Sequence, residues 1–376
     1  MPVQRISMVQ FRNYQEMGCE LAPKMNILYG ENGSGKTSIL EAIHCLAVTK
    51  SFKTPFDKYL VKHGEAYYQL RGIFTGNNTE DTVQLNYVKN QGKKLFINGN
   101  EADRLSVIVG RHPVVTLTPE DGDITFGAPS VRRKYFNKIM SQTSNKRMEL
   151  LQEFHQVLQQ RNSVIQAIAD GSGGVDETLL SVYDDRFIEV ATEVEKARGE
   201  FIREYSELVE EIYPQLSGSP HKLTIEFDPS VAYESADQFR EQCQELFEKR
   251  RNQELAFRRS VVGPQSDSID FSLGDTDLRH YGSQGEHKLV LVVLKLAEGR
   301  YIAAGNPHTP IYLFDDLFAE LDIKRSGQIL DFLGDRSQIF ITSTDLGDVR
   351  HHGVQIQQPD VKVLQMDELR ESTDVI

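Results

Sequence analysis

Eight consecutive residues near the N-terminus have the types and spacing needed to bind a phosphate chain. Residues 30–37 read Gly30-Glu31-Asn32-Gly33-Ser34-Gly35-Lys36-Thr37, which matches the pattern G-x-x-x-x-G-K-T. Glycines let the backbone curl so that several N–H groups face one phosphate, and the lysine reaches the β- and γ-phosphates. The threonine hydroxyl is a ligand for Mg²⁺. These residues therefore predict a site for a nucleoside triphosphate and Mg²⁺.

The flanking sequence gives this loop the context that it requires. The apolar run Met25 to Tyr29 predicts a β-strand that ends at the loop. The pattern from Ser38 to Leu46 predicts a helix just after it, whose positive end faces the bound phosphates. A glycine-rich turn without a ligand is the alternative, and the order of strand, loop and helix argues against it.

A second candidate segment lies near the other end of the chain. Ile311 to Phe314 is an uninterrupted apolar run, typical of a parallel strand buried on both faces, and Asp315 and Asp316 follow it. Folds with this phosphate loop place a metal-holding acidic residue at the end of such a strand. We assign Asp315 to Mg²⁺, opposite Thr37. Asp316 is then placed to orient or deprotonate the water that attacks the γ-phosphate. Two acidic residues that cap a helix are the alternative.

Length and composition limit the classes of protein. At 376 residues, with 39% hydrophobic and 26% charged, the chain predicts an ordered protein of one large domain with an inserted or appended second one. The net charge of −13 argues against a surface that attracts nucleic acid everywhere, so such binding requires a local basic patch or a partner. The N-terminal sequence lacks the features of a signal peptide, and the longest apolar run, Leu289 to Ala297, is too short to span a bilayer. We expect a cytoplasmic protein without a membrane segment.

The pattern along the chain predicts an α/β domain interrupted by helices. Short β-like runs fill the segment from Val3 to Leu117 and predict a sheet-rich lobe around the phosphate loop. Apolar residues at heptad spacing then predict two antiparallel helices, with Arg161 at one d position and a turn at Gly171 to Gly174. A further strand and a helix from Ala236 to about Arg259 precede the return of the α/β pattern. The nucleotide-binding fold is therefore predicted to be split.

A third segment adds a resemblance to a known architecture. Tyr281-Gly282-Ser283-Gln284-Gly285-Glu286 opens a helical pattern and presents a hydroxyl and glycine N–H groups at its positive end. By itself this segment is equally an N-cap. Its place between the phosphate loop and the Asp pair resembles the signature motif of the ABC ATPase superfamily, and Glu320-Leu321-Asp322 resembles the D-loop that follows.

The resemblance implies an α/β fold: a split ABC-type P-loop ATPase head with an inserted helical arm, a short antiparallel helical pair. Residues 1–135 would form the N-terminal part of the head, 136–260 the arm and 261–376 the C-terminal part. In that superfamily two chains stack head to tail, and the signature of one chain contacts the γ-phosphate bound to the other. Ser283 is then a catalytic contact beside Lys36 and Asp316. ATP would hold a homodimer together and hydrolysis would release it.

Further motifs narrow the resemblance. Five motifs occur in the order found in the RecF family of bacterial DNA replication and repair proteins, which the chain resembles. They are Phe11-Arg12-Asn13-Tyr14, Thr118-Pro119-Glu120-Asp121, Arg132-Arg133-Lys134-Tyr135-Phe136, the signature, and Phe314 to Asp322. The resemblance implies an ATP-dependent protein that binds single-stranded, gapped or junction DNA. It also implies cooperation with RecR and RecO to load the RecA recombinase, support of the SOS response, and slow DNA-stimulated ATP hydrolysis used as a switch. It makes Arg12 and Asn13 candidates for nucleotide contact, with a strand-end turn as the alternative.

Two segments depart from the family pattern. Glu286-His287 stands where Gln or Arg residues are common, and Gly263-Pro264-Gln265-Ser266-Asp267 replaces Gly-Pro-His-Arg-Asp. For DNA, the densest basic segments are Lys249 to Arg251 with Arg258-Arg259, and Arg132 to Lys134, which could contact phosphates without reading sequence. A solvated helix face is the alternative for the first segment. For Arg132 and Arg133 the alternative is that they fix the arm to the ATPase lobe.

Alternative functions stay open. An ABC transporter ATPase subunit would share the loop, signature and Asp strand, but the helical insertion, Asp316 instead of the usual glutamate, and Thr344 in place of a switch histidine argue against it. A phosphate-loop kinase needs only residues 30–37 and leaves the signature unexplained. An SMC-like clamp that acts without DNA, or with negligible turnover, would look much the same in sequence.

Overall fold

The computed structural model describes residues 1–76, 79–171, 177–316, 323–334 and 337–371. It divides into two compact units, Met1–Asp121 with Leu294–Ile376, and Gly122–Val293. We call the first the phosphate-loop unit and the second the arm unit. The boundaries expected from the sequence, at 135/136 and 260/261, stay predictions.

A five-stranded parallel sheet carries the phosphate loop, in the order β14-β3-β13-β12-β8. Its strands are β3 (Met25–Tyr29), β8 (Val114–Leu117), β12 (Ile311–Phe314), β13 (Ile339–Ser343) and β14 (Val361–Gln365). β8, β12 and β13 are buried along their whole length, as their apolar runs predict. β13 follows β12 in the chain but lies between β12 and β3 in the sheet. The carboxyl ends of β3, β13 and β12 are therefore neighbours at one edge.

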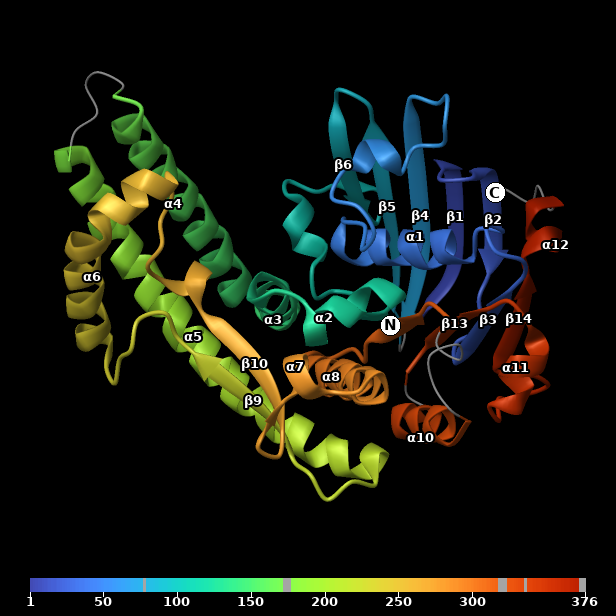
Figure 1. The fold of residues 1–376 in the computed structure, drawn as a ribbon. Helices are drawn as coiled ribbons and strands as arrows, with labels where there is room; N and C mark the ends of the chain where they lie inside the picture. The colour runs from blue at the N-terminus through green and yellow to red at the C-terminus, as the bar shows by residue number, and fades with distance from the viewer. Residues whose placement is uncertain (77–78, 172–176, 317–322, 335–336, 372–376) are drawn as a thin grey trace. The chain divides into compact units, whose positions relative to one another are not determined.

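A six-stranded antiparallel sheet, in the order β2-β1-β4-β5-β6-β7, completes the core of this unit. Its strands are β1 (Val3–Phe11), β2 (Tyr14–Glu20), β4 (Tyr67–Gly76), β5 (Thr79–Val88), β6 (Gly92–Ile97) and β7 (Asn100–Glu101). Helix α1 (Lys36–Val48) contacts β1, β4 and β5 of this sheet and β13 of the other, so it lies between the two sheets (Figure 1). Nearly all of its side chains are buried, as expected of a helix with a sheet on either side.

Sequence reasoning missed two strands of this unit, β2 and β14, and three helices that follow β12, which are α10, α11 and α12. β2 contains Glu16 and Gly18, which lower its strand propensity, and its pairing with β1 overrides that preference. Met366–Glu371 forms helix α12, for which the sequence shows no apolar pattern. The buried side chain of Met366 anchors this helix, and Asp367 and Glu368 complement its dipole.

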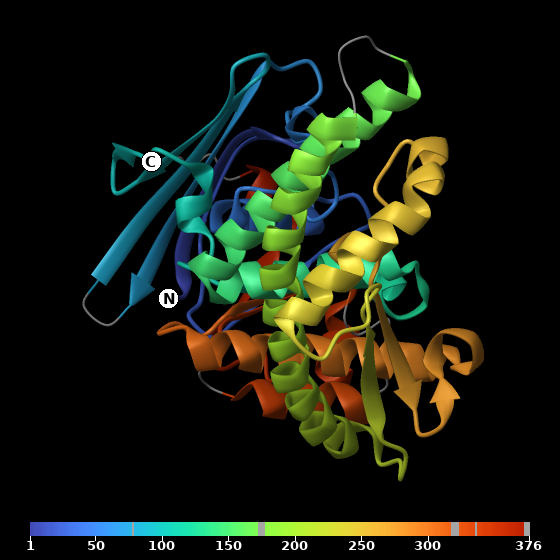
Figure 2. The ribbon, with the colours of Figure 1, turned by 90° about the vertical axis from the view of Figure 1, so that its left-hand side faces the viewer.

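In the arm unit, α4 (Asn145–Ala169) and α5 (Glu177–Ser217) run side by side, as the heptad spacing predicts (Figures 1 and 2). Helix α6 (Ala236–Phe257) packs against both of them. The predicted turn between α4 and α5 lies, beyond Gly171, outside the described residues. β9 (Leu223–Asp228), β10 (Ser268–Leu273) and β11 (Thr276–Asp277) form a three-stranded antiparallel sheet.

The remaining helices are short or connect these layers. They are η1 (Asp57–Tyr59), η2 (Leu105–Ile108), η3 (Pro119–Gly122), α2 (Asp123–Phe126), α3 (Pro129–Thr143), η4 (Pro264–Ser266), α7 (Leu278–Tyr281), α8 (Gln284–Gly305), α10 (Ile323–Leu333) and α11 (Leu346–His351). None of the described helices combines the length and the apolar character that crossing a membrane requires.

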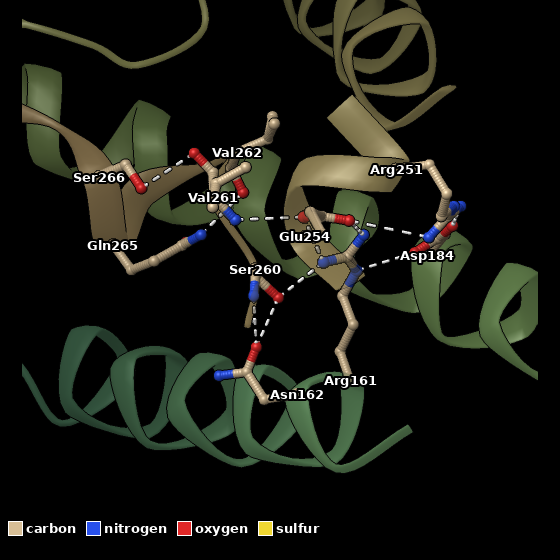
Figure 3. A network of polar contacts seen from close by, with 10 residues as sticks. All are labelled: Arg161, Asn162, Asp184, Arg251, Glu254, Ser260, Val261, Val262, Gln265 and Ser266. Atoms are coloured by element: carbon tan, nitrogen blue, oxygen red, sulfur yellow. Dashed lines mark hydrogen bonds and ion pairs between the residues drawn. The ribbon is translucent and has the colours of Figure 1, made fainter. Parts of the chain in front are cut away.

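A buried network of charges joins the arm helices (Figure 3). Arg161 of α4 donates two hydrogen bonds to Glu254 of α6, at 2.8 and 2.7 Å, and one to Asp184 of α5, at 2.8 Å. Its guanidinium also lies 4.1 Å from the centre of the Phe247 ring, and Arg251 donates to Asp184 at 2.6 Å. The residue that interrupts the apolar stripe in the sequence is therefore the point at which the arm helices meet.

The segment Gly263–Asp267 contacts helices α3 and α5 within the arm unit. Asp267 is buried and forms an ion pair with Arg198 of α5, while its carbonyl accepts a hydrogen bond from Arg133 of α3. Gly263 has a φ of 114°, and a Cβ at this position would lie 2.7 Å from Cζ of Phe187. The side chains of Gln265 and Ser266, the two positions that depart from the family pattern, donate to the nearby carbonyls of Val262 and Val261, so the ion pair of Asp267 with Arg198 does not depend on them.

We expect Arg161→Met to destabilise the arm unit by about 3 kcal/mol, because Glu254 and Asp184 stay buried and keep Arg251 alone of the two cations that they share. Native-state hydrogen exchange of the α4 and α6 amides measures this change within the unit. Arg186→Met is the matched control, because Arg186 pairs with Glu153 and Glu189 at the exposed surface. Equal protection in both variants and in the wild-type chain would contradict the role assigned to the network.

Candidate functional site

The predicted phosphate loop joins β3 to α1 at the carboxyl edge of the parallel sheet. Gly33 and Gly35 have φ values of 81° and 102°, in the region that favours glycine. At Gly35 a Cβ would also lie 2.5 Å from the Tyr14 hydroxyl oxygen, so any other residue would be strained and would have to displace the Tyr14 side chain. Because α1 begins at Lys36, its first N–H groups and positive dipole end face the loop. Residues 30–37 thus provide a cradle for an anion.

The Lys36 ammonium lies across the loop. It donates hydrogen bonds to the carbonyl oxygens of Gly30, at 2.6 Å, and Glu31, at 2.9 Å. Burial lowers the pKa of Lys36, and the nearby charges of Asp316 and Asp315 act in the opposite direction. The loop therefore holds a cation at its centre, between two carboxylates and the helix end.

The Asp315 carboxylate connects the loop to both neighbouring strands. Its two oxygens accept hydrogen bonds from the Thr37 hydroxyl, at 3.0 and 2.9 Å. The Thr342 hydroxyl at the end of β13 donates to it at 2.8 Å, and Lys53 Nζ lies 3.9 Å away. The order of strands explains this cluster, because β13 lies between the strand before the loop and the strand before Asp315.

Thr342 is a site residue that sequence reasoning missed. Its hydroxyl donates to Asp315 and accepts from the backbone N–H of Asp316 at 2.9 Å. In the sequence, the end of this strand was considered only because Thr344 stands where ABC transporters carry a switch histidine. The available signal was a buried apolar run that ends in hydroxyl residues, the same pattern of strand and polar end that revealed Asp315.

The Thr37 and Asp315 oxygens fit a Mg²⁺ ion. A hydroxyl and a carboxylate are hard oxygen donors, and Mg²⁺ commonly takes one or two such protein ligands while phosphate and water oxygens complete its shell. Among the described residues, no group of three His, Cys, Asp or Glu side chains is placed to hold a metal ion by itself. A metal at this edge would thus depend on a phosphate ligand.

Asp316 occupies an unusual backbone conformation next to this pair. Its φ of 56° is in the left-handed region, which aspartate tolerates better than most residues, and the hydrogen bond to Thr342 holds its N–H. The residue lines the same cleft as the loop. The structure therefore brings Lys36, Thr37, Asp315 and Asp316 together, as the sequence predicts.

A cleft of about 970 Å³ opens beside the loop, at the upper end of the range of roughly 300–1,000 Å³ found for ligand pockets. Six Lys and Arg side chains line the cleft, and Asp316 is the one acidic residue among the described residues that line it. The basic side chains are Arg12, Lys36, Lys53, Lys58, Lys62 and Lys89. In a chain with a net charge of −13, this is a strongly cationic surface suited to a polyanion.

Arg12 and Asn13 also line this cleft. The Arg12 guanidinium forms a two-pronged ion pair with Glu41 of α1, at 2.6 and 2.7 Å. Asn13 accepts a hydrogen bond from Ser38 at 3.3 Å. Both residues therefore position the turn after β1 against α1, and their contact with a nucleotide stays a prediction.

The signature segment lies in the arm unit, where Ser283 caps α8. Its hydroxyl donates to Glu286 at 2.7 Å and accepts from the Glu286 N–H at 3.3 Å, and its own N–H donates to Glu286 at 2.8 Å. These bonds lower the pKa of Glu286. The arrangement is a capping box, so Glu286 has a structural reason for its departure from the family pattern. The D-loop candidate, Glu320 to Asp322, lies outside the described residues.

The basic segments proposed for DNA are largely engaged inside the arm unit. Arg132 is buried and donates to Asp270 at 2.6 Å and to the Gly127 carbonyl at 2.8 Å. Lys249 pairs with Glu245, Arg251 with Asp184, and Arg258 with Asp170. Arg132 and Arg133 thus make their contacts within the arm unit, and a role in fixing the arm to the ATPase lobe stays a prediction.

Comparisons with known proteins place this chain in a family. The RecF/RecN/SMC N terminal domain family matches residues 2–357. The DNA replication and repair protein RecF of Salinibacter ruber is 36% identical over 343 residues, covering 90% of this chain and 83% of that protein. RecF of Halalkalibacterium halodurans is 33% identical over 94% of this chain and 96% of its own length.

Solved structures agree with this assignment. The recombination mediator protein RecF with ATP, of the RecFOR pathway, has a TM-score of 0.85 and 28% identity, and the match covers 92% of each chain. An Smc head bound to the C-winged helix domain of ScpA, at 15% identity and a TM-score of 0.55, shares the fold. The predicted α/β ATPase head is thus confirmed. Because relatives and structures match over nearly the whole length, this chain belongs to the RecF family.

Proposed function

We propose that the protein is an ATP-dependent DNA-binding protein of recombinational repair and replication-gap processing. The observation that carries the proposal is the phosphate loop joined through Thr37 to Asp315, beside a cleft lined by lysines. Family membership supplies the context, since its relatives are named as DNA replication and repair proteins. The chain would bind single-stranded and gapped DNA and help to load a recombinase, with RecR and RecO as partners, and so support SOS induction.

The nucleotide would be ATP. Lys36 and the loop amides would bind its β- and γ-phosphates, and Thr37 and Asp315 would hold Mg²⁺, which neutralises phosphate charge. Asp316 would orient the attacking water and accept its proton as the bond between the γ-phosphorus and the β,γ-bridging oxygen breaks. The products are ADP and phosphate. Thr342 would act as a positioning residue, because its hydroxyl holds both the Asp315 carboxylate and the Asp316 backbone.

ATP would also control assembly. We propose a head-to-tail homodimer in which Ser283 of one chain contacts the γ-phosphate bound to the other, so that the triphosphate stabilises the dimer and slow hydrolysis releases it. The exposed position of Ser283 at the N-terminus of α8 supports this role, because the helix end is favourable for an anion. An ABC transporter subunit and a DNA-independent SMC-like clamp are the competing functions.

The proposed function is tested by ATP hydrolysis per chain over a range of protein concentrations, with and without gapped duplex DNA, at two salt concentrations. We expect the rate per chain to rise with protein concentration, because the site is completed by a second chain. It should rise further with DNA, and less so at high salt, because phosphate contacts release counterions. A rate indifferent to concentration and DNA would favour a phosphate-loop protein whose partner is not DNA.

We expect Asp316→Asn to keep ATP-dependent dimerisation and to slow hydrolysis by roughly 100-fold or more, because the amide cannot accept the proton of the attacking water. Single-turnover hydrolysis with excess protein measures this step. Asp103→Asn, at an exposed position of the same unit, is the control for the loss of one negative charge. Normal turnover by the Asp316 variant would remove this residue from the role.

Ser283→Arg should bind ATP and remain monomeric, because the long side chain and its charge block the surface that meets the second chain. Analytical ultracentrifugation with and without ATP reports the assembly, and Lys36→Ala is the control that fails to bind the nucleotide. Ser283→Thr retains a capping hydroxyl and should dimerise, which separates the contact from the stability of α8. ATP-dependent dimers of the arginine variant would refute the shared site.

A further inference from the structure

Two aromatic rings stand exposed at the rim of the cleft, on and beside helix η1 (Asp57–Tyr59). Phe56 is 57% exposed and Tyr59 is 55% exposed. Their ring centres lie 5.9 Å apart with an angle of 86° between the planes, and the Lys58 ammonium lies 5.7 and 5.0 Å from the two centres. We call Phe56, Lys58 and Tyr59 the aromatic platform.

The platform is held in place by its backbone. The Tyr59 carbonyl accepts a hydrogen bond from the Arg12 side chain at 3.0 Å, and the Leu60 carbonyl accepts one from the Arg12 N–H at 2.7 Å. On the other side, Asp57 forms an ion pair with Lys93 at 3.0 Å. The rings are therefore exposed on a fixed turn. An aromatic surface that is fixed before binding loses little entropy when a ligand covers it.

Positive charge surrounds the platform. Lys62 and Lys89 line the same cleft as Lys58 and Tyr59, and Lys89 donates to the carbonyl of Glu65. In the described part of the chain, Lys58, Lys62 and Lys89 have no carboxylate within 4.0 Å. Flat rings beside unneutralised lysines match the two surfaces of a single nucleic-acid strand, the faces of its bases and its phosphates.

We propose that the aromatic platform stacks the unpaired bases of a single-stranded nucleic acid while Lys58, Lys62 and Lys89 bind its phosphates. This inference rests on the proposed function and names the surface that would perform it. Bases inside a duplex are covered by their neighbours, so the platform would prefer single strands. Phe56 lies outside the lining of the cleft, so a nucleotide in the loop would leave this ring free for the strand.

The test compares a labelled single strand of about 20 nucleotides with an abasic strand of the same length, which keeps the phosphates and lacks the bases. With ATP present, we expect the wild-type chain to bind the base-containing strand about tenfold or more tightly, since stacking contributes roughly 1–3 kcal/mol per base. The double variant F56A/Y59A should bind both strands equally. The variant F56L/Y59L keeps apolar bulk and should show the same loss. Phe257→Ala removes an equally exposed ring from α6 and is the matched control.

The double variant K62A/K89A tests the phosphate contacts. It should weaken binding to both strands and flatten the salt dependence by about 1.4 in the log–log slope, at roughly 0.7 for each lost contact to a single strand. A preference for bases that survives F56A/Y59A would overturn the proposal.

Other outcomes identify what covers the rings instead. If Phe56→Ala weakens ATP binding and leaves strand binding unchanged, the rings hold the adenine of ATP and the proposal is wrong. If the variants lose only ATP-dependent dimerisation, a second copy of the chain covers the platform, which also overturns it. Failure of the wild-type chain to bind either strand would reject DNA binding itself, and a wild-type chain that binds both strands equally would reject only the stacking.

Discussion

The contacts of one buried carboxylate, that of Asp315, fix the geometry on which the rest of the site depends. It accepts hydrogen bonds from Thr37 at the start of α1 and from Thr342 at the end of β13, and it ends β12 itself. A carboxylate that is only 7% exposed is costly without such donors, so these elements are stable only when they meet at one point. The same constraint places two hard oxygen donors where a phosphate chain would enter. The arrangement of Thr37, Asp315 and Thr342 that stabilises this edge of the sheet is therefore also the arrangement that a site for Mg²⁺ and phosphate requires.

Local patterns made much of this site predictable from sequence. The strand, loop and helix around Lys36 and the buried run before Asp315 are each contiguous in the chain, so composition and spacing reveal them. The position of β13 between β3 and β12 is not contiguous, because it depends on a crossover between distant strands, and Thr342 was missed for that reason. The cleft escaped prediction in the same way, since Lys62 and Lys89 belong to turns that meet only after β4 and β5 pair. In contrast, the runs of basic residues in the sequence suggested Arg132 and Arg251 as DNA contacts, but both form ion pairs within the arm unit.

Arginine and lysine are divided between two tasks. The buried cations Arg132, Arg161 and Arg198 each pair with carboxylates inside the arm unit. The guanidinium suits such sites because it is planar, weakly hydrated and able to make several directed hydrogen bonds. The cleft of the phosphate-loop unit is lined mainly by lysines, whose compact charges stay hydrated until an anion arrives. An acidic chain can thus keep a cationic cleft, because carboxylates of the arm unit pair with its buried arginines, whereas the cleft, among the residues that the structure describes, is lined by five lysines, Arg12 and one carboxylate, that of Asp316.

This division has a consequence for the two proposed ligands. Lys36 and Lys53 lie close to the Asp315 carboxylate, and they line one cleft together with Lys62 and Lys89. Screening in salt acts over about 8–10 Å, so anions bound in one cleft sense each other's charge. Taken alone, the part of the ATP charge that Mg²⁺ leaves unneutralised would reduce the attraction of the remaining lysines for a strand. By linkage, a strand at the aromatic platform would then weaken ATP binding by the same factor. The ATP-dependent DNA binding that we propose would therefore have to come from assembly of the second chain. Any stimulation of turnover by DNA would then have to come from assembly of the second chain or from the transition state, because ground-state affinity for ATP changes in the opposite direction.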